Sequence, residues 1–407
     1  MTATRKTFLL TAVIFTTAWL LSACQSDDDS PNVSPEARGD LVSDSRLVTH
    51  SSEDINALFA SLGLFTDTPA VYDVAAYRIV YKTVDTKGNL IDASGLLTIP
   101  LKARGAKSPL LSYHHGTKFL DADVPSNSYG LIAEPVIAAS FGYIVSAPDY
   151  IGYGASRGLM HPHGITEPQA IASIDMLRAS RQYLVEHDIA TNQQLFLGGH
   201  SEGGTTTIAT LKMMQEKYAD EFSVTASTAG GGAYDRSATV AWFLQSTFMP
   251  QPATVGFTVK AYNTVYELNR LDEIIQAPYV EIIDTYYDGS KSHEQINEKL
   301  PTNPAELFTP KFLADFNGDG ETELKRLIAQ NDIYDWAPAV PTRLFRGKDD
   351  INAPYFNSTT AVNAMKANGA PDVELVECQE VPADHYTCRV PYFVYSLQFF
   401  AQYASDL

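Results

Sequence analysis

Several features are scarce in this sequence, and each scarcity excludes a class of protein. Only 3 of the 407 residues are cysteine, so the chain is not a scaffold built on many disulfides. Basic residues number 29 against 48 acidic ones, and the net charge of −19 argues against binding to nucleic acid, which needs a clustered basic surface. The 25 glycines and 22 prolines are too few for a fibrous or low-complexity chain, and a hydrophobic content of 45% is too high for a disordered one. The length fits one large or two medium globular domains.

Long apolar runs are equally scarce, since the sequence has one, at residues 8–21. Arg5 and Lys6 precede it, and Leu-Ser-Ala-Cys ends it at Cys24, which is the layout of a secretory signal peptide. The run is shorter than the roughly 20 residues that a membrane-spanning helix needs. The Leu-Ser-Ala-Cys ending resembles the bacterial lipobox, which implies that Cys24 carries lipid, including palmitate, and becomes the mature N-terminus. A plain signal peptide or an N-terminal membrane helix is the alternative.

The segment after Cys24 is polar and acidic, with three consecutive aspartates at 27–29. Such a composition cannot bury enough apolar surface to fold. We therefore expect a signal peptide over residues 1–23 and a flexible acidic tether over 24–50. Gln25, by resemblance to the sorting pattern of Gram-negative lipoproteins, favours anchoring in the outer membrane. The expected membrane partner is thus the bacterial envelope, reached through the lipid.

Residues 76–84 and 93–99 alternate apolar and polar side chains around a glycine-containing turn at 85–88, which predicts an antiparallel hairpin. Short apolar runs follow at 109–113, 143–147 and 194–197, separated by helical patterns near 128–140 and 167–186. Strands that alternate with helices predict a mostly parallel sheet covered by helices on both faces.

The stretch 238–331 has helical spacing and no convincing strand, whereas strand patterns return at 342–346 and 373–377 and a closing helix is expected over 392–403. We interpret 238–331 as a helical cap or lid inserted into an α/β core formed by 51–237 and 332–407. A separate second domain is the less favoured alternative, because the sheet pattern resumes after the insertion.

The sharpest motif is Gly-His-Ser-Glu-Gly at 199–203, which has the form G-x-S-x-G. A strand pattern precedes it and a helical pattern follows it, which is the context of a nucleophilic serine on a sharp strand-to-helix turn. The glycines leave room for neighbouring backbone, and the helix N-terminus offers free N–H groups to a developing oxyanion. The motif predicts Ser201 as the nucleophile.

A serine on such a turn needs an acid and a histidine that follow it in that order along the chain. Of the nine histidines, only His385 follows the strand pattern at 342–346, and Asp349 and Asp350 lie directly after that strand. These residues predict a Ser-Asp-His triad, with either aspartate as the acid.

An oxyanion hole also needs a second donor from the loop after the first parallel strand. Residues 113–117 form that loop, and we expect the backbone N–H groups of Thr117 and Glu202 to be the donors. His114 and His115 are interpreted as shaping the loop rather than carrying protons.

The segments at 113–117, 199–204 and 347–354 resemble the α/β-hydrolase superfamily, and the resemblance covers residues from about 70 to the C-terminus. The family pattern around the acid, G-x-x-D-x-x-V-P, aligns Asp350 with the catalytic position and leaves Asp349 as the alternative. Residues 148–162 and 331–338 are similar to secretory lipases and related esterases. Glu202 stands where a glutamine is more usual, and His163 replaces an expected tyrosine, so the substrate preference stays open.

The resemblance implies a serine hydrolase that cleaves small-molecule or lipid esters, with no cofactor, no metal and no nucleic-acid partner. An EF-hand-like start at 315–321 lacks the bidentate glutamate at the twelfth loop position, which is Arg326 here, and we interpret it as a polar turn. If Cys24 is acylated, Cys378 and Cys388 are the two remaining thiols, and an oxidising compartment predicts a disulfide between them that holds the segment around His385. A serine peptidase and a catalytically inactive binding lipoprotein are the alternative functions.

Overall fold

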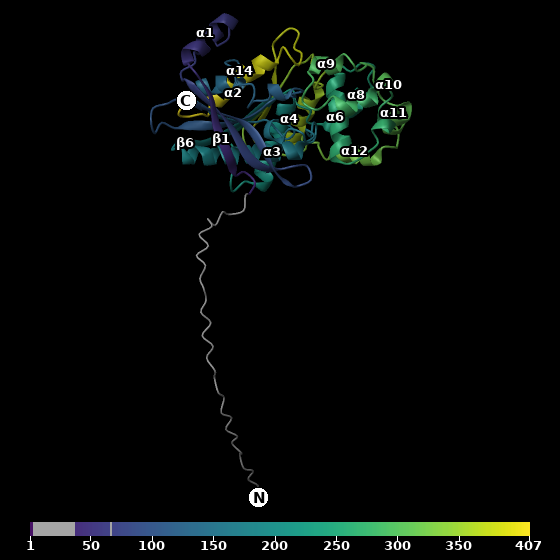
Figure 1. The fold of residues 1–407 in the computed structure, drawn as a ribbon, viewed down its shortest axis with the longest axis horizontal. Coiled ribbons are helices and arrows are strands. Elements are labelled where there is room, and N and C mark those ends of the chain that lie inside the picture. The colour runs from purple at the N-terminus through teal and green to yellow at the C-terminus, as the bar shows by residue number, and fades with distance from the viewer. Residues whose placement is uncertain (3–36, 66) are drawn as a thin grey trace, which may run out of the picture. The chain divides into compact units, whose positions relative to one another are not determined.

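A mixed β-sheet forms the centre of the chain in the computed structural model, which describes residues 1–2, 37–65 and 67–407 (Figure 1). The predicted signal peptide, Cys24 and the beginning of the tether fall on the remaining N-terminal residues and lie outside this part. In the described residues nine strands join one sheet, in the order β1-β2-β3-β5-β4-β6-β7-β8-β9. They are β1 (Leu41–His50), β2 (Val74–Val84), β3 (Leu90–Pro100), β4 (Ser108–His114), β5 (Ile144–Pro148), β6 (Thr191–His200), β7 (Ala226–Gly230), β8 (Thr342–Arg346) and β9 (Val373–Glu377).

The sheet changes from antiparallel to parallel at β5. Strand β2 pairs antiparallel with β1 on one side and with β3 on the other, and β3 also pairs antiparallel with β5. From β5 through β4 and β6 to β9 every pairing is parallel. The parallel strands therefore end at one edge of the sheet, where loops can gather side chains that are distant in sequence.

One boundary expected from the sequence is wrong. The tether was expected to reach residue 50, but residues 41–50 are β1, which pairs with β2 along its length. Most β1 side chains are exposed or half-buried, so the strand carries no clear apolar alternation. Backbone hydrogen bonding to the open edge of β2 places it in the sheet, and that edge exists only once the hairpin of β2 and β3 has formed.

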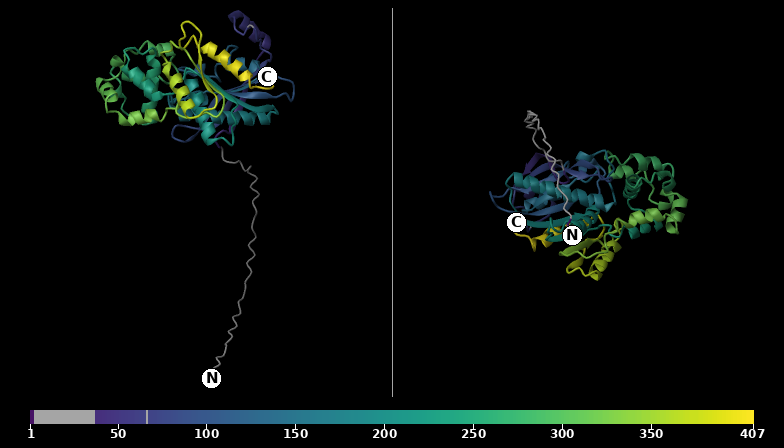
Figure 2. Two further views of the ribbon diagram at one scale, coloured as in Figure 1. Left: turned by 180° about the vertical axis from the view of Figure 1, so that it is seen from behind. Right: turned by 90° about the horizontal axis from the view of Figure 1, so that it is seen from below.

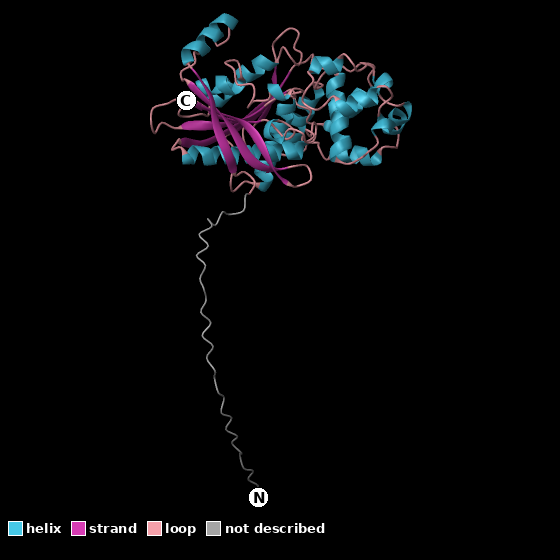
Figure 3. Cartoon of the chain, viewed as in Figure 1, coloured by secondary structure: helices cyan, strands magenta, loops and turns pink. Residues whose placement is uncertain are grey.

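Successive side chains of the central strands pack into two separate apolar layers, one on each face of the sheet, because side chains alternate between the faces of a strand. Leu110 and Leu344 pack with one layer, whereas Leu111 and Phe345 pack with the other. Helices α3 (Thr166–Glu186), α4 (Glu202–Lys217) and α13 (Phe356–Ala367) cover the first face. Helices α1 (Ser52–Leu62), α2 (Glu134–Ser140) and α14 (Arg389–Ala401) cover the second (Figure 3).

The segment between β7 and β8 is helical and gathers beside the sheet as a separate cluster of short helices (Figures 1 and 2). Its own apolar core includes Phe257, Ile283 and Phe308, and Phe119 and Tyr150 of the α/β core pack against it. We call this cluster, from α5 to α12, the cap. Its helices are α5 (Arg236–Gln245), α6 (Pro252–Val265), α7 (Leu271–Ile274), α8 (Tyr279–Thr285), α9 (His293–Asn297), α10 (Pro304–Leu307), α11 (Pro310–Asn317) and α12 (Thr322–Ala329).

Most elements predicted from pattern are confirmed. The hairpin, β8 and β9 lie where the alternation placed them, while α2 begins six residues later than the pattern suggested, at Glu134. Two short 3₁₀ turns, η1 (Asp121–Asp123) and η2 (Gly154–Ser156), follow β4 and β5 in the chain. Among the described residues, none of the helices combines the length and the apolar character that a bilayer span requires.

Candidate active site

Ser201 occupies the turn between β6 and α4 in a backbone conformation that few residues adopt. Its φ is 63° and its ψ is −125°, and its amide donates to the carbonyl of Gly230 in β7 at 2.8 Å. Such strain persists only where the surroundings enforce it, and it is typical of functional turns. A side chain at Gly203 would collide with the carbonyl of His114 in β4, so glycine is required where α4 crosses the sheet edge. The tight turn lifts the Ser201 hydroxyl above the ends of the parallel strands.

The structure brings Ser201, His385 and Asp350 into one hydrogen-bonded line. Nε2 of His385 lies 2.8 Å from Oγ of Ser201, and Nδ1 of His385 lies 2.7 Å from Oδ2 of Asp350. The carboxylate accepts from Nδ1–H, which leaves Nε2 free to accept the serine proton. His385 and Asp350 are both buried. This is the arrangement of a nucleophile, a general base and an orienting acid.

The two adjacent aspartates have different partners. Asp350 also accepts two backbone hydrogen bonds through Oδ1, from Asn352 and Ala353, each at 2.9 Å. Asp349 turns toward the segment before His385, where its carboxylate accepts from the amide of Ala383 at 2.9 Å and its own amide donates to the Ala383 carbonyl. Asp350 is therefore the aspartate in contact with His385, and Asp349 holds the backbone that carries it.

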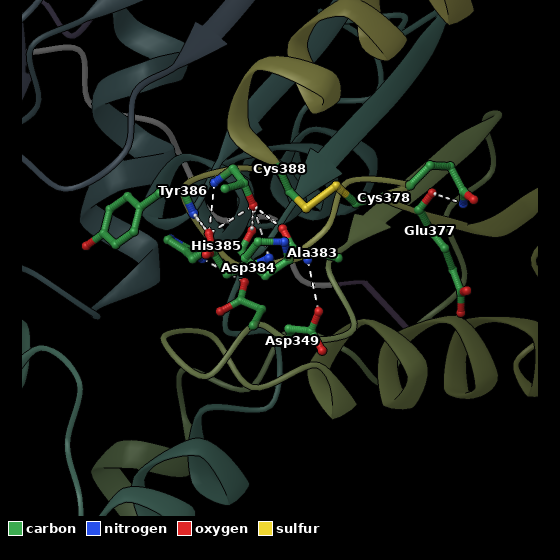
Figure 4. Close-up of a disulfide and its surroundings, with 12 residues drawn as sticks. Asp349, Glu377, Cys378, Ala383, Asp384, His385, Tyr386 and Cys388 are labelled. Atoms are coloured by element: carbon green, nitrogen blue, oxygen red, sulfur yellow. Dashed lines mark hydrogen bonds and ion pairs between the residues drawn. A yellow bond between two sulfur atoms is a disulfide. The ribbon is translucent and has the colours of Figure 1, made fainter.

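The predicted disulfide between Cys378 and Cys388 is present and brackets this segment (Figure 4). Its two sulfurs join the end of β9 to the start of α14, ten residues apart. Figure 4 shows His385 on the loop between the bridged cysteines, with Asp349 bonded to that loop at Ala383. Gly347 passes so close to this loop that a side chain there would meet the Ala383 carbonyl. The loop is thus fixed at both ends and in its middle.

The residues that carry the expected oxyanion donors are close to the serine in sequence or in space. The Glu202 amide belongs to the first turn of α4, where helix N–H groups have no partner within the helix. Gly116 packs against Ser201, since a side chain there would lie 3.4 Å from the serine Cβ, and Thr117 follows it on the same loop. Residues Thr117, Ser201 and Glu202 line one cavity. The positions fit a two-donor hole.

The side chain of Glu202 is buried beneath the nucleophile in a polar cluster. Its Oε1 accepts from Nε2 of Gln169 at 2.6 Å and lies 2.9 Å from Nε2 of His161. Burial acts to raise the pKa of Glu202, but the neighbouring His163 and His161 hold it below the ordinary value of a glutamate. A glutamine at this position would carry no negative charge beside these two histidines.

Several other histidines near the site are kept neutral by burial. Burial lowers the pKa of His114 to about 3 and, with the charge of Lys118, lowers that of His115 to about 4. His114 lies within hydrogen-bonding distance of Ser112 and Thr207. Burial, followed by the charges of His385 and Arg389, also depresses the pKa of His200. Nδ1 of His115 lies 2.7 Å from the carbonyl oxygen of Gly116, on the oxyanion loop. That His114 and His115 shape this loop stays a prediction.

A cavity of about 380 Å³ opens on Ser201 and continues between the α/β core and the cap. Its cap side is formed by apolar side chains from α5, α6, α7, α11 and α12, and its core side carries Ser201, His385 and the oxyanion loop. Six residues represent the apolar side: Val240, Leu244, Val255, Phe312, Leu324 and Ile328. A concave, mostly apolar site with a few polar groups at one end suits a substrate with an apolar chain.

No group of three or more metal-ligating side chains occurs in the described part of the chain. The EF-hand-like segment spans the end of α11 and the start of α12, where Glu321 binds Arg270 through two hydrogen bonds of 2.9 and 2.6 Å. The Glu321 carboxylate therefore has a cationic partner within the cap, which fits a structural turn.

Comparison with known proteins agrees with this geometry. Residues 132–270 match the secretory lipase family model. The rice cell wall degrading esterase LipA from Xanthomonas oryzae superposes with a TM-score of 0.81 and 25% identity, over 90% of this chain and 100% of LipA. The chain is a carboxylic-ester hydrolase with the α/β-hydrolase fold. No curated protein matches its sequence significantly.

Two further structures resemble the hydrolase. A proposed hydrolase from Legionella pneumophila has a TM-score of 0.82 and 28% identity, covering 89% of this chain and 98% of its own. Candida antarctica lipase A in its closed state has a TM-score of 0.67 and 18% identity, covering 90% of this chain and 82% of its own, and shares the fold.

The sequence missed several residues that support the hydrolase site. The phenol of Tyr392 in α14 accepts from the amide of Gly199 at 2.7 Å and so braces the strand before the nucleophile. Lys118, Glu134 and Arg389 line the cavity near the oxyanion loop. No spacing rule connects residues this far apart in sequence, so only the closed fold reveals that they meet.

Proposed function

We propose that the hydrolase cleaves carboxylic esters through Ser201, His385 and Asp350 with a covalent acyl-enzyme intermediate. The supporting observation is the continuous line of hydrogen-bonding distances from Ser201 Oγ through His385 to Asp350, at the mouth of an apolar cavity. In the first half-reaction Ser201 Oγ attacks the ester carbonyl and His385 Nε2 takes the serine proton. The carbonyl oxygen becomes an oxyanion, which the amides of Thr117 and Glu202 stabilise.

The intermediate then collapses as His385 returns the proton to the leaving alcohol. Water repeats the sequence on the acyl-serine and releases the carboxylic acid. Asp350 keeps Nδ1 protonated and stabilises the imidazolium that forms in each half-reaction. The two backbone donors to Asp350 Oδ1 keep its other oxygen directed at His385.

The apolar lining of the cavity favours a substrate whose acyl group is apolar, either fatty or aromatic. Apolar side chains of the cap line the same cavity as Ser201, so an acyl chain attached to Ser201 Oγ would have room beneath the cap. The volume of about 380 Å³ lies at the lower end of the range for small-molecule sites. These features support esters of short to medium acyl chains.

The decisive experiment measures turnover by the full-length protein in detergent with p-nitrophenyl esters of increasing chain length and with peptide p-nitroanilides. We expect ester turnover that Ser201→Ala abolishes and that the exposed-serine control Ser61→Ala leaves unchanged. Ester turnover that persists in Ser201→Ala would refute the nucleophile assignment. Turnover of the anilides alone would identify a peptidase, and turnover of neither substrate would favour a binding protein.

We also propose that the hydrolase is a lipoprotein anchored in the bacterial envelope through Cys24. The support is the Leu-Ser-Ala-Cys sequence after the apolar run and the acidic stretch that follows it. Growth of an expressing Gram-negative host with an alkyne fatty acid should label the protein, and Cys24→Ser should remove both the label and the membrane association. Unlabelled protein in the soluble periplasmic fraction would overturn the anchor.

A further inference from the structure

Lys118 is a cation on the cavity wall beside the oxyanion loop. It follows Thr117 directly, lines the cavity and is partly buried. Its backbone carbonyl accepts from the phenol of Tyr153, but within the described residues its ammonium has no hydrogen-bond or ion-pair partner. Burial, and then the charge of Arg389, lower the pKa of this ammonium. A partly desolvated lysine without a partner is costly unless a ligand supplies the opposite charge.

A second cation, Arg389, lines the same part of the cavity. Its guanidinium is paired with Glu134, which also lines the cavity. The pair leaves Lys118 as the uncompensated charge of this trio. Glu134 and Asp123 favour the charged form of Lys118 without bonding to it. The wall is therefore positive, although the whole chain carries a net charge of −19.

This positive wall shares the cavity with His385, the residue that must serve the leaving group. The alcohol that departs must lie near His385 Nε2, because that atom donates its proton. Arg389 begins the helix that follows the His385 loop, and the disulfide at Cys388 holds the loop and the helix start together. An acyl chain bound against the apolar cap side chains would leave the cationic part of the wall, with Lys118 and Arg389, to the alcohol part of the substrate.

We propose that the hydrolase prefers esters whose alcohol part carries an anionic group, a carboxylate or a phosphate, which Lys118 binds with Arg389 beside it. The proposal rests on the proposed ester hydrolysis and concerns only its substrate class. The reaction itself is unchanged: water adds across the acyl–oxygen bond, and the products are a carboxylic acid and the anionic alcohol. The anion completes the polar contacts that Lys118 lacks, and a charge-assisted hydrogen bond is stronger than a neutral one.

The test uses two matched pairs of substrates with the full-length protein in detergent. The first pair is 4-butyryloxybenzoate and its neutral amide, 4-butyryloxybenzamide. The second is monobutyryl glycerol phosphate and monobutyryl glycerol. For each pair the ratio of kcat/KM, anionic over neutral, is compared between wild type, Lys118→Met and the exposed-lysine control Lys107→Met. Dividing the anionic-over-neutral ratio of a variant by that of the wild type cancels the intrinsic reactivity of each leaving group.

We expect Lys118→Met to lower the anionic preference about tenfold in at least one pair, mainly through KM, and Lys107→Met to leave it unchanged. An effect on the first pair alone identifies a carboxylate as the recognised group, and an effect on the second alone identifies a phosphate. Equal ratios in wild type and Lys118→Met for both pairs would overturn the proposal. The neutral esters decide the proposed function separately, since wild type must hydrolyse them whatever the anionic preference is.

Should Lys118→Met fail to fold, the wild-type protein still provides a test. Recognition of an anion by an exposed or half-buried cation weakens as salt screens the charges. The anionic preference of the wild type should fall several-fold between 20 and 500 mM NaCl, while kcat/KM for the neutral esters changes much less. A preference that is absent at low salt would also overturn the proposal.

Discussion

Nδ1 of His385 lies 2.7 Å from Oδ2 of Asp350, although 35 residues separate the two in sequence. Asp350 follows β8, whereas His385 lies on the loop between β9 and α14. The pair meets because β8 and β9 run parallel and end at the same edge of the sheet. Bonds from Asp349 to Ala383 fix the distance between the two loops.

Asp350→Asn and Asp349→Asn should separate the roles of the two aspartates. Asn at 350 can present an amide N–H to Nδ1 and so favour the wrong histidine tautomer, and we expect kcat to fall by about 10⁴-fold. Asn at 349 keeps an oxygen that can accept from the Ala383 amide, so we expect less than a tenfold loss. Steady-state kinetics on a p-nitrophenyl ester measure both, and the assignment is wrong if Asp349→Asn is the more damaged variant.

Loss of the disulfide should affect both stability and activity. The bridge closes a segment of ten residues, and Cys378→Ala with Cys388→Ala should lower the free energy of unfolding by about 2–3 kcal/mol. Because the bridged segment carries His385, we also expect kcat to decrease while the secondary structure stays intact. Urea unfolding and ester kinetics measure the two effects. A double variant with wild-type kcat would show that Asp349 and Gly347 alone hold the histidine loop.

Substitution inside the cap should change the chain-length preference. Val255 lines the cavity from α6, so a tryptophan there fills space that a long acyl chain needs. We expect Val255→Trp to lower kcat/KM for p-nitrophenyl decanoate by at least tenfold and for the acetate by less than about twofold.

Val280→Trp is the matched control, because Val280 packs in the cap from α8 and is half-buried like Val255, but does not line the cavity. Its ratio of decanoate to acetate turnover should equal that of the wild type. A similar decrease in kcat/KM for both esters in Val255→Trp would indicate general damage to the cap instead of a blocked acyl site.

The buried histidines should make the protein less stable in mild acid. The pKa of His114 is about 3 in the folded protein, against 6.5 for an exposed histidine, so the unfolded state binds more protons between these values. The free energy of unfolding therefore falls as the pH drops from 6.5 toward 3, by about 1.4 kcal/mol per pH unit for this residue. His115 and His163, whose pKa values burial lowers to about 4, act in the same direction.

His114→Gln should remove the contribution of this residue to the pH dependence. That contribution is a decrease of about 2 kcal/mol in the free energy of unfolding between pH 6.5 and 5. Urea midpoints at several pH values measure it, with the exposed His187→Gln as the control for loss of an imidazole. If the pH dependence of wild type and His114→Gln is the same, His114 takes up a proton in the folded state.

The sequence by itself determined the parts of this hydrolase that local chemistry encodes. Ser201 was recognisable because its strained turn requires small neighbours such as Gly203. Strands β8 and β9 were recognisable because each is a short segment with apolar residues of strand character. The expectation of an oxidising compartment, with Cys24 acylated and two thiols left, was sufficient to predict the disulfide. These signals depend on residues close together along the chain, where steric and chemical requirements act directly.

Only the tertiary structure decided between Asp349 and Asp350 as the partner of His385, because a turn can present either of two adjacent carboxylates. It also placed β1 in the sheet, where backbone hydrogen bonds to β2 outweigh a polar composition. Glu202 and Lys118 show the same limit. Their burial, and the presence or absence of a partner, follow from how the α/β core and the cap close over one cavity, which no local pattern specifies.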